Sequence, residues 1–192
     1  MHPVEVSEGR VDETGREFEV LFETDRLRVR LFRADDAPVF NARFQADPDV
    51  LRYSGKPRNL AQTEGYVAQA IRWTQANSDG YGTWAIEEKT SGALCGWISL
   101  GWHEGRENVE TAYAIAKARW GRGLATEAVC GMLRYAFDEL GLAAVAAAVH
   151  PENRASIRVL EKAGLRKVEA AASSHYGPLD FYAIARPTQD VP

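Results

Sequence analysis

The chain has 192 residues, of which 45% are hydrophobic, 26% charged and 10% aromatic, and its formal net charge is −4 at pH 7. This length and composition are typical of one folded globular domain with a sizeable core. The small negative charge provides no basic surface for nucleic acid, and no apolar run approaches the ~20 residues that a membrane span needs.

The two cysteines, Cys95 and Cys130, lie far apart in the sequence and have no metal-ligand spacing. This usage predicts reduced thiols in a cytoplasmic protein and argues against a disulfide framework. The histidines have no companion ligands nearby, so we expect no metal site.

Residues 1–16 are polar and aperiodic, and we expect them to form a mobile arm before a single domain over 17–192. From 18 to 31 the apolar residues recur with strand-like spacing. A short helical pattern follows over 35–44 and is interrupted by Pro48. Asn59 and Gln62 then form a capping box, which predicts the start of a second helix.

The middle of the chain has the pattern of a strand meander, and after it the spacing of apolar residues changes to that of a helix. Strands are predicted at 83–88, 93–100 and 109–115, with turns at 90–92 and 105–108. The strongest helical period covers 124–140 and ends at Gly141. A buried strand at 142–149, a short helix at 153–163 and two final strands at 165–172 and 179–185 complete one domain with a mixed sheet.

The segment from Trp120 to Glu127, between the third meander strand and the long helix, carries the clearest chemical pattern. A glycine-bearing loop that leads into a helix N-terminus presents free backbone N–H groups and the positive end of the helix dipole. Gly121 and Gly123 allow an anion to approach the backbone, and Arg122 adds positive charge. A phosphate or diphosphate would fit there, although a strand-to-helix turn also needs glycines for its own geometry.

A second motif opens the next helix, where Asn153 and Ser156 follow the buried strand directly. With this motif, the loop, the strand Glu110-Thr111-Ala112-Tyr113 and the opening Glu23-Thr24-Asp25-Arg26-Leu27, the sequence resembles the GNAT family of acetyl-CoA-dependent N-acetyltransferases. It is most similar to the branch of the ribosomal-protein acetyltransferases RimJ and RimL. The resemblance covers about residues 23–186, with the motifs in the family's order.

The resemblance implies an α+β fold, with a mixed, mostly antiparallel sheet of six to seven strands and about four helices. It also implies acetyl-CoA as co-substrate and no metal. The family's pyrophosphate loop falls on Trp120 to Ala125, where Trp120 replaces the usual Gln or Arg; because the loop acts through its backbone, binding is still expected. The residues implied in cofactor binding are Gly121, Arg122, Gly123, Leu124, Ala125 and Thr126 at the pyrophosphate, and Tyr113, Ile115 and Asn153 along the pantetheine arm.

Acetyl transfer requires an amine that has lost a proton and a stabilised thiolate leaving group. The resemblance makes Glu110 the candidate base, against the alternative of a solvated or salt-bridged strand residue. The family's usual tyrosine acid is replaced by Leu160, and Ser156 is the candidate partner of the thiolate. A serine at this helical position can instead bond to the backbone near the cap.

The acceptor remains open among a protein N-terminus, a polyamine, an amino acid and an aminoglycoside. An alternative class is a coenzyme A-binding sensor or partner module without catalysis, in which the loop and Asn153 would persist. A nucleotide-binding protein is disfavoured, because the loop lacks the Lys-Ser/Thr pair of a P-loop. Members of the RimJ/RimL branch often form homodimers, so pairing of the final strands across a two-fold axis is an alternative to a monomer.

Overall fold

The computed structural model describes residues 10–11, 17–18, 20–77, 79–102, 109–173 and 177–187. The predicted turn at 105–108 and most of the predicted mobile arm lie outside these residues. Within the arm region, β1 (Arg10–Val11) pairs with β2 (Glu17–Phe18) as a small antiparallel sheet.

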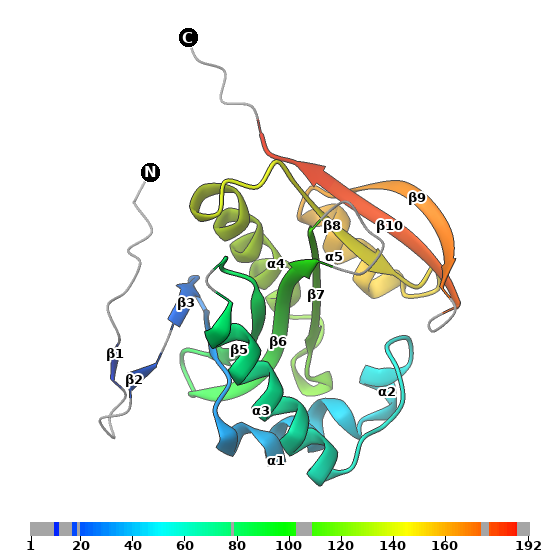
Figure 1. Ribbon diagram of the computed structural model, residues 1–192. Coiled ribbons are helices and arrows are strands. Elements are labelled where there is room, and N and C mark those ends of the chain that lie inside the picture. Colours follow the sequence, from blue (N-terminus) through cyan, green and yellow to red (C-terminus); the bar gives the residue numbers. More distant parts are fainter. Residues whose placement is uncertain are drawn as a thin grey trace.

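The main sheet has eight strands (Figure 1). They are β3 (Val20–Glu23), β4 (Leu27–Leu31), β5 (Gly82–Glu88), β6 (Ala93–Trp102), β7 (Val109–Ile115), β8 (Ala144–Val149), β9 (Arg166–Ser173) and β10 (Gly177–Ala185). Their spatial order is β3-β4-β5-β6-β7-β8-β10-β9, and every neighbouring pair is antiparallel except the parallel pair β7–β8.

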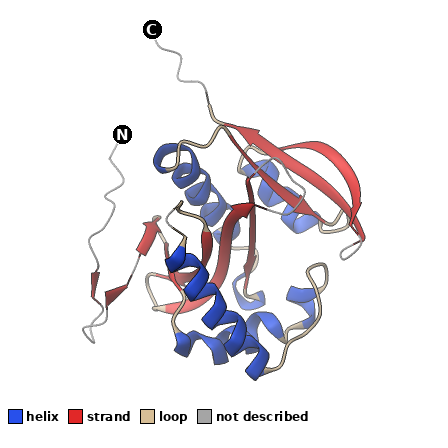
Figure 2. Cartoon of the chain, in the orientation of Figure 1, coloured by secondary structure: helices blue, strands red, loops and turns tan. Residues whose placement is uncertain are grey.

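The described residues also contain five α-helices, which Figure 2 distinguishes from the strands by colour. These are α1 (Ala37–Phe40), α2 (Pro48–Leu51), α3 (Leu60–Ala76), α4 (Leu124–Arg134) and α5 (Arg154–Lys162). Short 3-10 turns occupy Ala34–Asp36 and Lys117–Arg119, and π turns occupy Asn41–Gln45 and Tyr135–Glu139.

The predicted α+β class with a mixed, mostly antiparallel sheet is confirmed, and the sheet has one strand more than the six to seven expected. The stretch with strand-like spacing over 18–31 contains the separate strands β3 and β4. Thr24 donates its backbone N–H to the carbonyl of Leu27 at 2.9 Å, which closes a tight turn between them. Apolar alternation continues on both sides of this turn, so periodicity alone did not separate the two strands.

Local sequence signals placed the helix ends well. Asn59 and Gln62 form the predicted capping box at the start of α3, with reciprocal hydrogen bonds of 2.9 and 3.0 Å. Asp47 caps α2, and Pro48 at its first position begins a helix after interrupting the previous one. The long predicted helix over 124–140 is α4 followed by the π turn that ends near Leu140.

Two cores hold the layers together on opposite faces of the sheet. Helices α1 and α3 cover the face on which Ala85, Leu94 and Ala116 are buried. Helix α4 covers the other face, and its neighbour α5 packs against both α4 and β8. Because side chains alternate along a strand, the position of each β7 residue decides which layer it faces.

The sheet opens between β7 and β8. Their parallel pairing has a single register position, Glu110 with Ala146, whereas β6 and β7 stay paired from Gly96–Ile115 to Trp102–Val109. Beyond Glu110 the two strands diverge, and the edge of β7 that faces β8 is left without a strand partner. Among the helices of the described residues, none is long and apolar enough to cross a bilayer.

Candidate active site

The glycine loop after β7 has the geometry of an anion site. Gly121 and Gly123 both have left-handed φ values, +74° and +77°, which favour glycine strongly. Gly123 is the N-cap of α4, and no side chain among the described residues caps this helix. The first backbone bond of the helix runs from Glu127 N–H to Gly123 O at 3.1 Å, so the N–H groups at 124–126 precede it. These donors and the helix dipole suit a phosphate group.

The start of α4 is fixed by the turn between β3 and β4. The carboxylate of Glu127 accepts hydrogen bonds from the Thr24 hydroxyl at 2.5 Å and from the Arg26 backbone N–H at 2.9 Å. Arg26 also forms an ion pair with Glu127 at 2.6 Å and donates to the carbonyl of Arg122 at 2.9 Å. The opening motif and the loop motif, distant in sequence, therefore form one structural unit.

The unpaired edge of β7 carries the residues expected along the pantetheine arm. Ala116 donates its N–H to Cys95 of β6 at 2.9 Å. Because alternate residues of a strand direct their backbone groups to opposite sides, those of Tyr113 and Ile115 turn toward β8. The carbonyl of Ile115 already accepts a 2.6 Å hydrogen bond from the indole N–H of Trp120, which fixes the exit of the strand beside the loop.

Ser156 lies across the opening from β7, in the first turn of α5. Its hydroxyl is 2.8 Å from the hydroxyl of Tyr113, which also donates to the Ser156 carbonyl at 3.3 Å. Burial raises the pKa of Tyr113 to about 12, although its hydrogen bond with Ser156 acts in the opposite direction. The phenol is therefore neutral at physiological pH and can donate.

Asn153 acts as the N-cap of α5. Its side-chain oxygen accepts the backbone N–H of Ser156 at 3.1 Å, so the motif fixes the serine locally. For Ser156 the alternative was a hydroxyl bond to the backbone near this cap, whereas the hydroxyl contacts Tyr113 of β7.

Glu110 lies at the point where β7 and β8 separate, and only 7% of it is exposed. Side chains alternate along β7, so that of Glu110 lies on the same side as those of Ala112 and Ala114, which is the α1–α3 face. Tyr113 and Ser156 lie on the α4–α5 face. Gly101 is its neighbour on β6, and a Cβ there would lie 3.3 Å from the Trp73 ring of α3. The two candidate catalytic groups therefore approach the opening from opposite faces.

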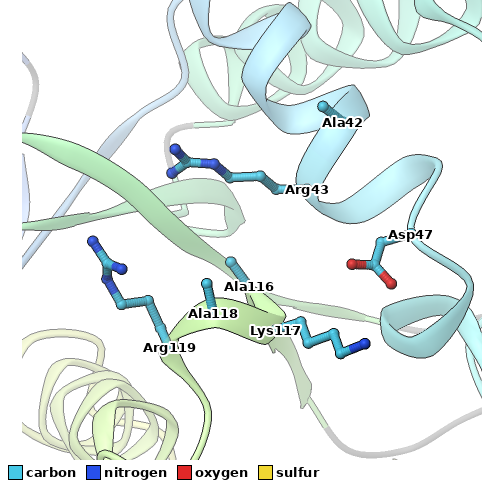
Figure 3. Close-up of a pocket in the computed structure, with 7 residues that line it drawn as sticks. All are labelled: Ala42, Arg43, Asp47, Ala116, Lys117, Ala118 and Arg119. Atoms are coloured by element: carbon cyan, nitrogen blue, oxygen red, sulfur yellow. The ribbon is translucent and has the colours of Figure 1, made fainter.

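An open hollow of about 560 Å³ adjoins the loop, between residues 42–47 and the 116–119 segment (Figure 3). Three cations and one carboxylate lie around a floor of alanines: Ala42, Arg43, Asp47, Ala116, Lys117, Ala118 and Arg119. Arg43 and Arg119 extend toward the same end of the hollow, while Lys117 lies on the side of Asp47 (Figure 3). Arg119, which lines this hollow, directly precedes Trp120 at the start of the loop.

The remaining candidates have structural surroundings. His150 accepts the backbone N–H of Glu152 at 3.2 Å, and its ring stacks on Tyr53 at 5.0 Å. Burial raises the pKa of the Cys95 thiol to about 12, which makes it a poor nucleophile. Among the described residues there is no cluster of potential metal ligands.

Five aromatic residues in or beside the sheet differ in exposure and in the face on which they lie: Trp73, Tyr81, Trp84, Trp97 and Trp102. Trp84 is in the core, whereas Trp73 and Trp102 are 47% and 59% exposed. Trp102 contacts Tyr81 edge-on, on the α4 face, and Trp73 lies over Gly101 on the opposite face. Trp73 and Trp97, which packs against the α1–α3 core, share the face of Glu110.

An anion loop at a helix N-terminus, beside two splayed strands and the free edge of β7, is the arrangement that the resemblance to a family of acyltransferases implies. The GNAT acetyltransferase domain model matches residues 26–166, and the chain belongs to this family. Two Bacillus subtilis (strain 168) proteins are similar in sequence. YkkB is 37% identical over 74% of this chain and 83% of its own length. The N-acetyltransferase YoaA is 30% identical over 88% of this chain and 98% of its own length.

Solved structures show the same fold. Mycobacterium smegmatis RimJ in complex with CoA-disulfide has a TM-score of 0.70 and 21% identity, and the match covers 83% of this chain and 81% of RimJ. RimJ is a member of the branch that the sequence resembles.

Several contacts of the site were not predicted from the sequence. These are the Tyr113–Ser156 hydrogen bond, the ties of Thr24 and Arg26 to Glu127, and the pairing of Arg122 with Glu88 at 2.8 Å. The residues of the loop and of the opening motif had been singled out, but their partners lie on other elements.

Proposed function

We propose that this acetyltransferase moves the acetyl group of acetyl-CoA to a primary amine by direct attack. The observation that carries the proposal is the uncapped N-terminus of α4, with its two left-handed glycines, directly beside the free edge of β7. The loop would bind the diphosphate, and the Tyr113 and Ile115 backbone would pair with the amides of the pantetheine arm.

Acetyl-CoA would supply an activated thioester, and the protein would supply position and proton handling. Glu110, buried on the α1–α3 face, is the proposed base that removes a proton from the ammonium, directly or through water. The free amine attacks the thioester carbonyl carbon, the C–S bond breaks, the thiolate leaves, and the remaining extra proton on the nitrogen passes to the thiolate, directly or through water. Ser156, on the opposite face, would donate a hydrogen bond to that sulfur, and a backbone N–H of β7 would stabilise the oxyanion.

The hollow beside the loop supports a phosphate-bearing donor, since Arg43, Lys117 and Arg119 line it over small side chains. The acceptor would enter on the face of Glu110, where Trp73 provides an exposed aromatic surface. We propose an amine acceptor of the protein N-terminal, ribosomal-protein or small-molecule class.

The direct test is thiol release from acetyl-CoA with a panel of N-terminal peptides, polyamines, amino acids and aminoglycosides. Acceptor-dependent release, with the acetylated product verified by mass, is expected. Glu110→Gln should lower kcat, while acetyl-CoA still binds. Tight binding without release for any amine would favour the alternative of a coenzyme A-binding sensor.

A further inference from the structure

Glu88 lies at the end of β5, outside every motif considered above, yet it contacts the anion loop. The residue is 5% exposed. Its carboxylate accepts a hydrogen bond from Arg119 Nε at 2.9 Å and forms an ion pair with Arg122 Nη2 at 2.8 Å. These two arginines flank Trp120 and Gly121 in the sequence, so one carboxylate holds both sides of the loop.

The backbone of Glu88 is itself held in a tight turn. The N–H groups of Ser91 and Gly92 donate to its carbonyl at 3.2 and 2.9 Å, and the Ser91 hydroxyl lies 3.3 Å from its carboxylate. Gly92 has a φ of +62°, which suits glycine at this turn. Burial raises the pKa of the Glu88 carboxyl, but the hydrogen bonds and charges of Arg119 and Arg122 hold it below its ordinary value. The group is therefore an ionised acceptor on a rigid support.

We propose that Glu88 is a positioning residue that holds Arg119 and Arg122 at the anion loop and so determines the preference for a diphosphate-bearing acyl donor over a pantetheine thioester without phosphate. The proposal rests on the proposed function of the loop. Arg119 also lines the basic hollow, so the same carboxylate connects the hollow with the loop. Guanidinium groups bind phosphate well only when their planar donors are oriented, and Glu88 fixes that orientation.

A purely electrostatic role and a positioning role of Glu88 predict opposite effects on diphosphate affinity when its charge is removed. Two guanidiniums and one carboxylate carry a local charge of about +1, and neutralising Glu88 would raise it to about +2. If charge alone mattered, Glu88→Gln would bind a diphosphate more tightly. If position matters, the two arginines lose their common acceptor and the diphosphate binds more weakly.

The experiment is calorimetric titration of wild type and Glu88→Gln with acetyl-CoA, with acetyl-pantetheine measured by competition. We expect Glu88→Gln to weaken acetyl-CoA binding by about tenfold, which corresponds to the loss of about one charge-assisted hydrogen bond. Binding of acetyl-pantetheine should change by less than about twofold, since it lacks the group that the arginines contact. Glu139→Gln, an exposed change of equal charge at the far end of the α4 segment, should leave both affinities unchanged.

A double-mutant cycle tests whether Glu88 acts through Arg122. In an Arg122→Gln background, Glu88→Gln should weaken acetyl-CoA binding by only about two- to threefold, because the shared interaction is already lost. Unchanged or tighter binding of acetyl-CoA by Glu88→Gln, or an equal loss for both donors, would overturn the proposal. If Glu88→Gln does not fold, the Arg119→Gln and Arg122→Gln pair provides the test, and retained preference for acetyl-CoA would overturn it.

These binding measurements separate this proposal from the proposed function. Wild type that binds acetyl-CoA but acetylates no amine would contradict catalysis and leave the role of Glu88 measurable. Wild type that does not bind acetyl-CoA would contradict both.

Discussion

The hydroxyl of Tyr113 lies 2.8 Å from that of Ser156, and this contact joins β7 to the first turn of α5 across the opening of the sheet. Tyr113 comes from a strand whose neighbour has diverged, and Ser156 is fixed by the Asn153 cap. When the phenol donates its one proton to the serine hydroxyl oxygen, rather than to the Ser156 carbonyl 3.3 Å away, the serine proton is free for the leaving sulfur. The pair thus unites a structural bridge with the proposed thiolate site.

We expect Tyr113→Phe and Ser156→Ala each to lower the free energy of unfolding by about 1 kcal/mol, the usual value of one hydrogen bond. The double variant should cost about the same as either single change, because both remove one interaction. Ser156→Ala should also lower kcat with little change in KM for acetyl-CoA. Urea unfolding and steady-state kinetics check both. Unchanged kcat in Ser156→Ala would mean that water protonates the thiolate.

Arg30 should be the most sensitive ionic position for stability among the described residues. It is 2% exposed, binds Asp36 through two hydrogen bonds of 2.8 and 2.9 Å, and donates to Glu87 at 2.9 Å. Arg30→Gln removes the cation that pairs with the buried Asp36 and leaves the buried Glu87 with the more exposed Arg28 and Arg33, and it should cost about 3–5 kcal/mol of unfolding free energy. Arg28→Gln, on the same strand but 29% exposed, is the matched control and should cost less than about 1 kcal/mol. Equal losses in urea unfolding would contradict the role of burial.

Glu127 should make stability depend on pH on the acidic side. Burial raises the pKa of its carboxyl, but hydrogen bonds from Thr24 and Arg26 outweigh this and hold the pKa below the ordinary value. Its contribution is therefore fully present above the pKa of the unfolded chain, about 4.3, and is lost as the pH falls through the lower folded value.

Glu127→Gln should thus lower the unfolding free energy by about 1 kcal/mol at pH 7, and the difference from wild type should shrink between about pH 5 and pH 3. Chemical unfolding at several pH values measures it. A difference that stays constant or grows as the pH falls would show that the carboxylate charge is not what anchors the loop.

Two glycines allow opposite predictions for the same substitution. Gly121 has a φ of +74°, and no atom lies within 4 Å of the position that a Cβ would occupy, so Gly121→Ala introduces backbone strain rather than a clash. It should destabilise the protein by about 1–2 kcal/mol and weaken acetyl-CoA binding. Gly65 is an exposed residue within α3 with similar free space, and Gly65→Ala should stabilise by about 0.5–1 kcal/mol without affecting binding. Thermal unfolding and calorimetry distinguish the two effects.

The sequence by itself determined the local elements and the position of the anion loop. Capping at Asn59, the helical period from Leu124 and the glycines before it all depend on residues within a few positions of one another. The resemblance to the GNAT family, confirmed by the match over residues 26–166, came from the same short motifs. The hairpin between β3 and β4 was missed, because alternation of apolar residues is the same on both sides of its turn.

Only the tertiary structure decided which of these residues meet. Arg26 reaches Glu127 across 101 positions, Tyr113 reaches Ser156 across 43, and Arg119 reaches Glu88 across 31. It also set Glu110 and Ser156 on opposite faces of the sheet, which depends on strand parity and on the order of the strands. Helix caps and periodicity act through the local backbone, whereas these contacts depend on how distant elements pack, and no local pattern encodes that arrangement.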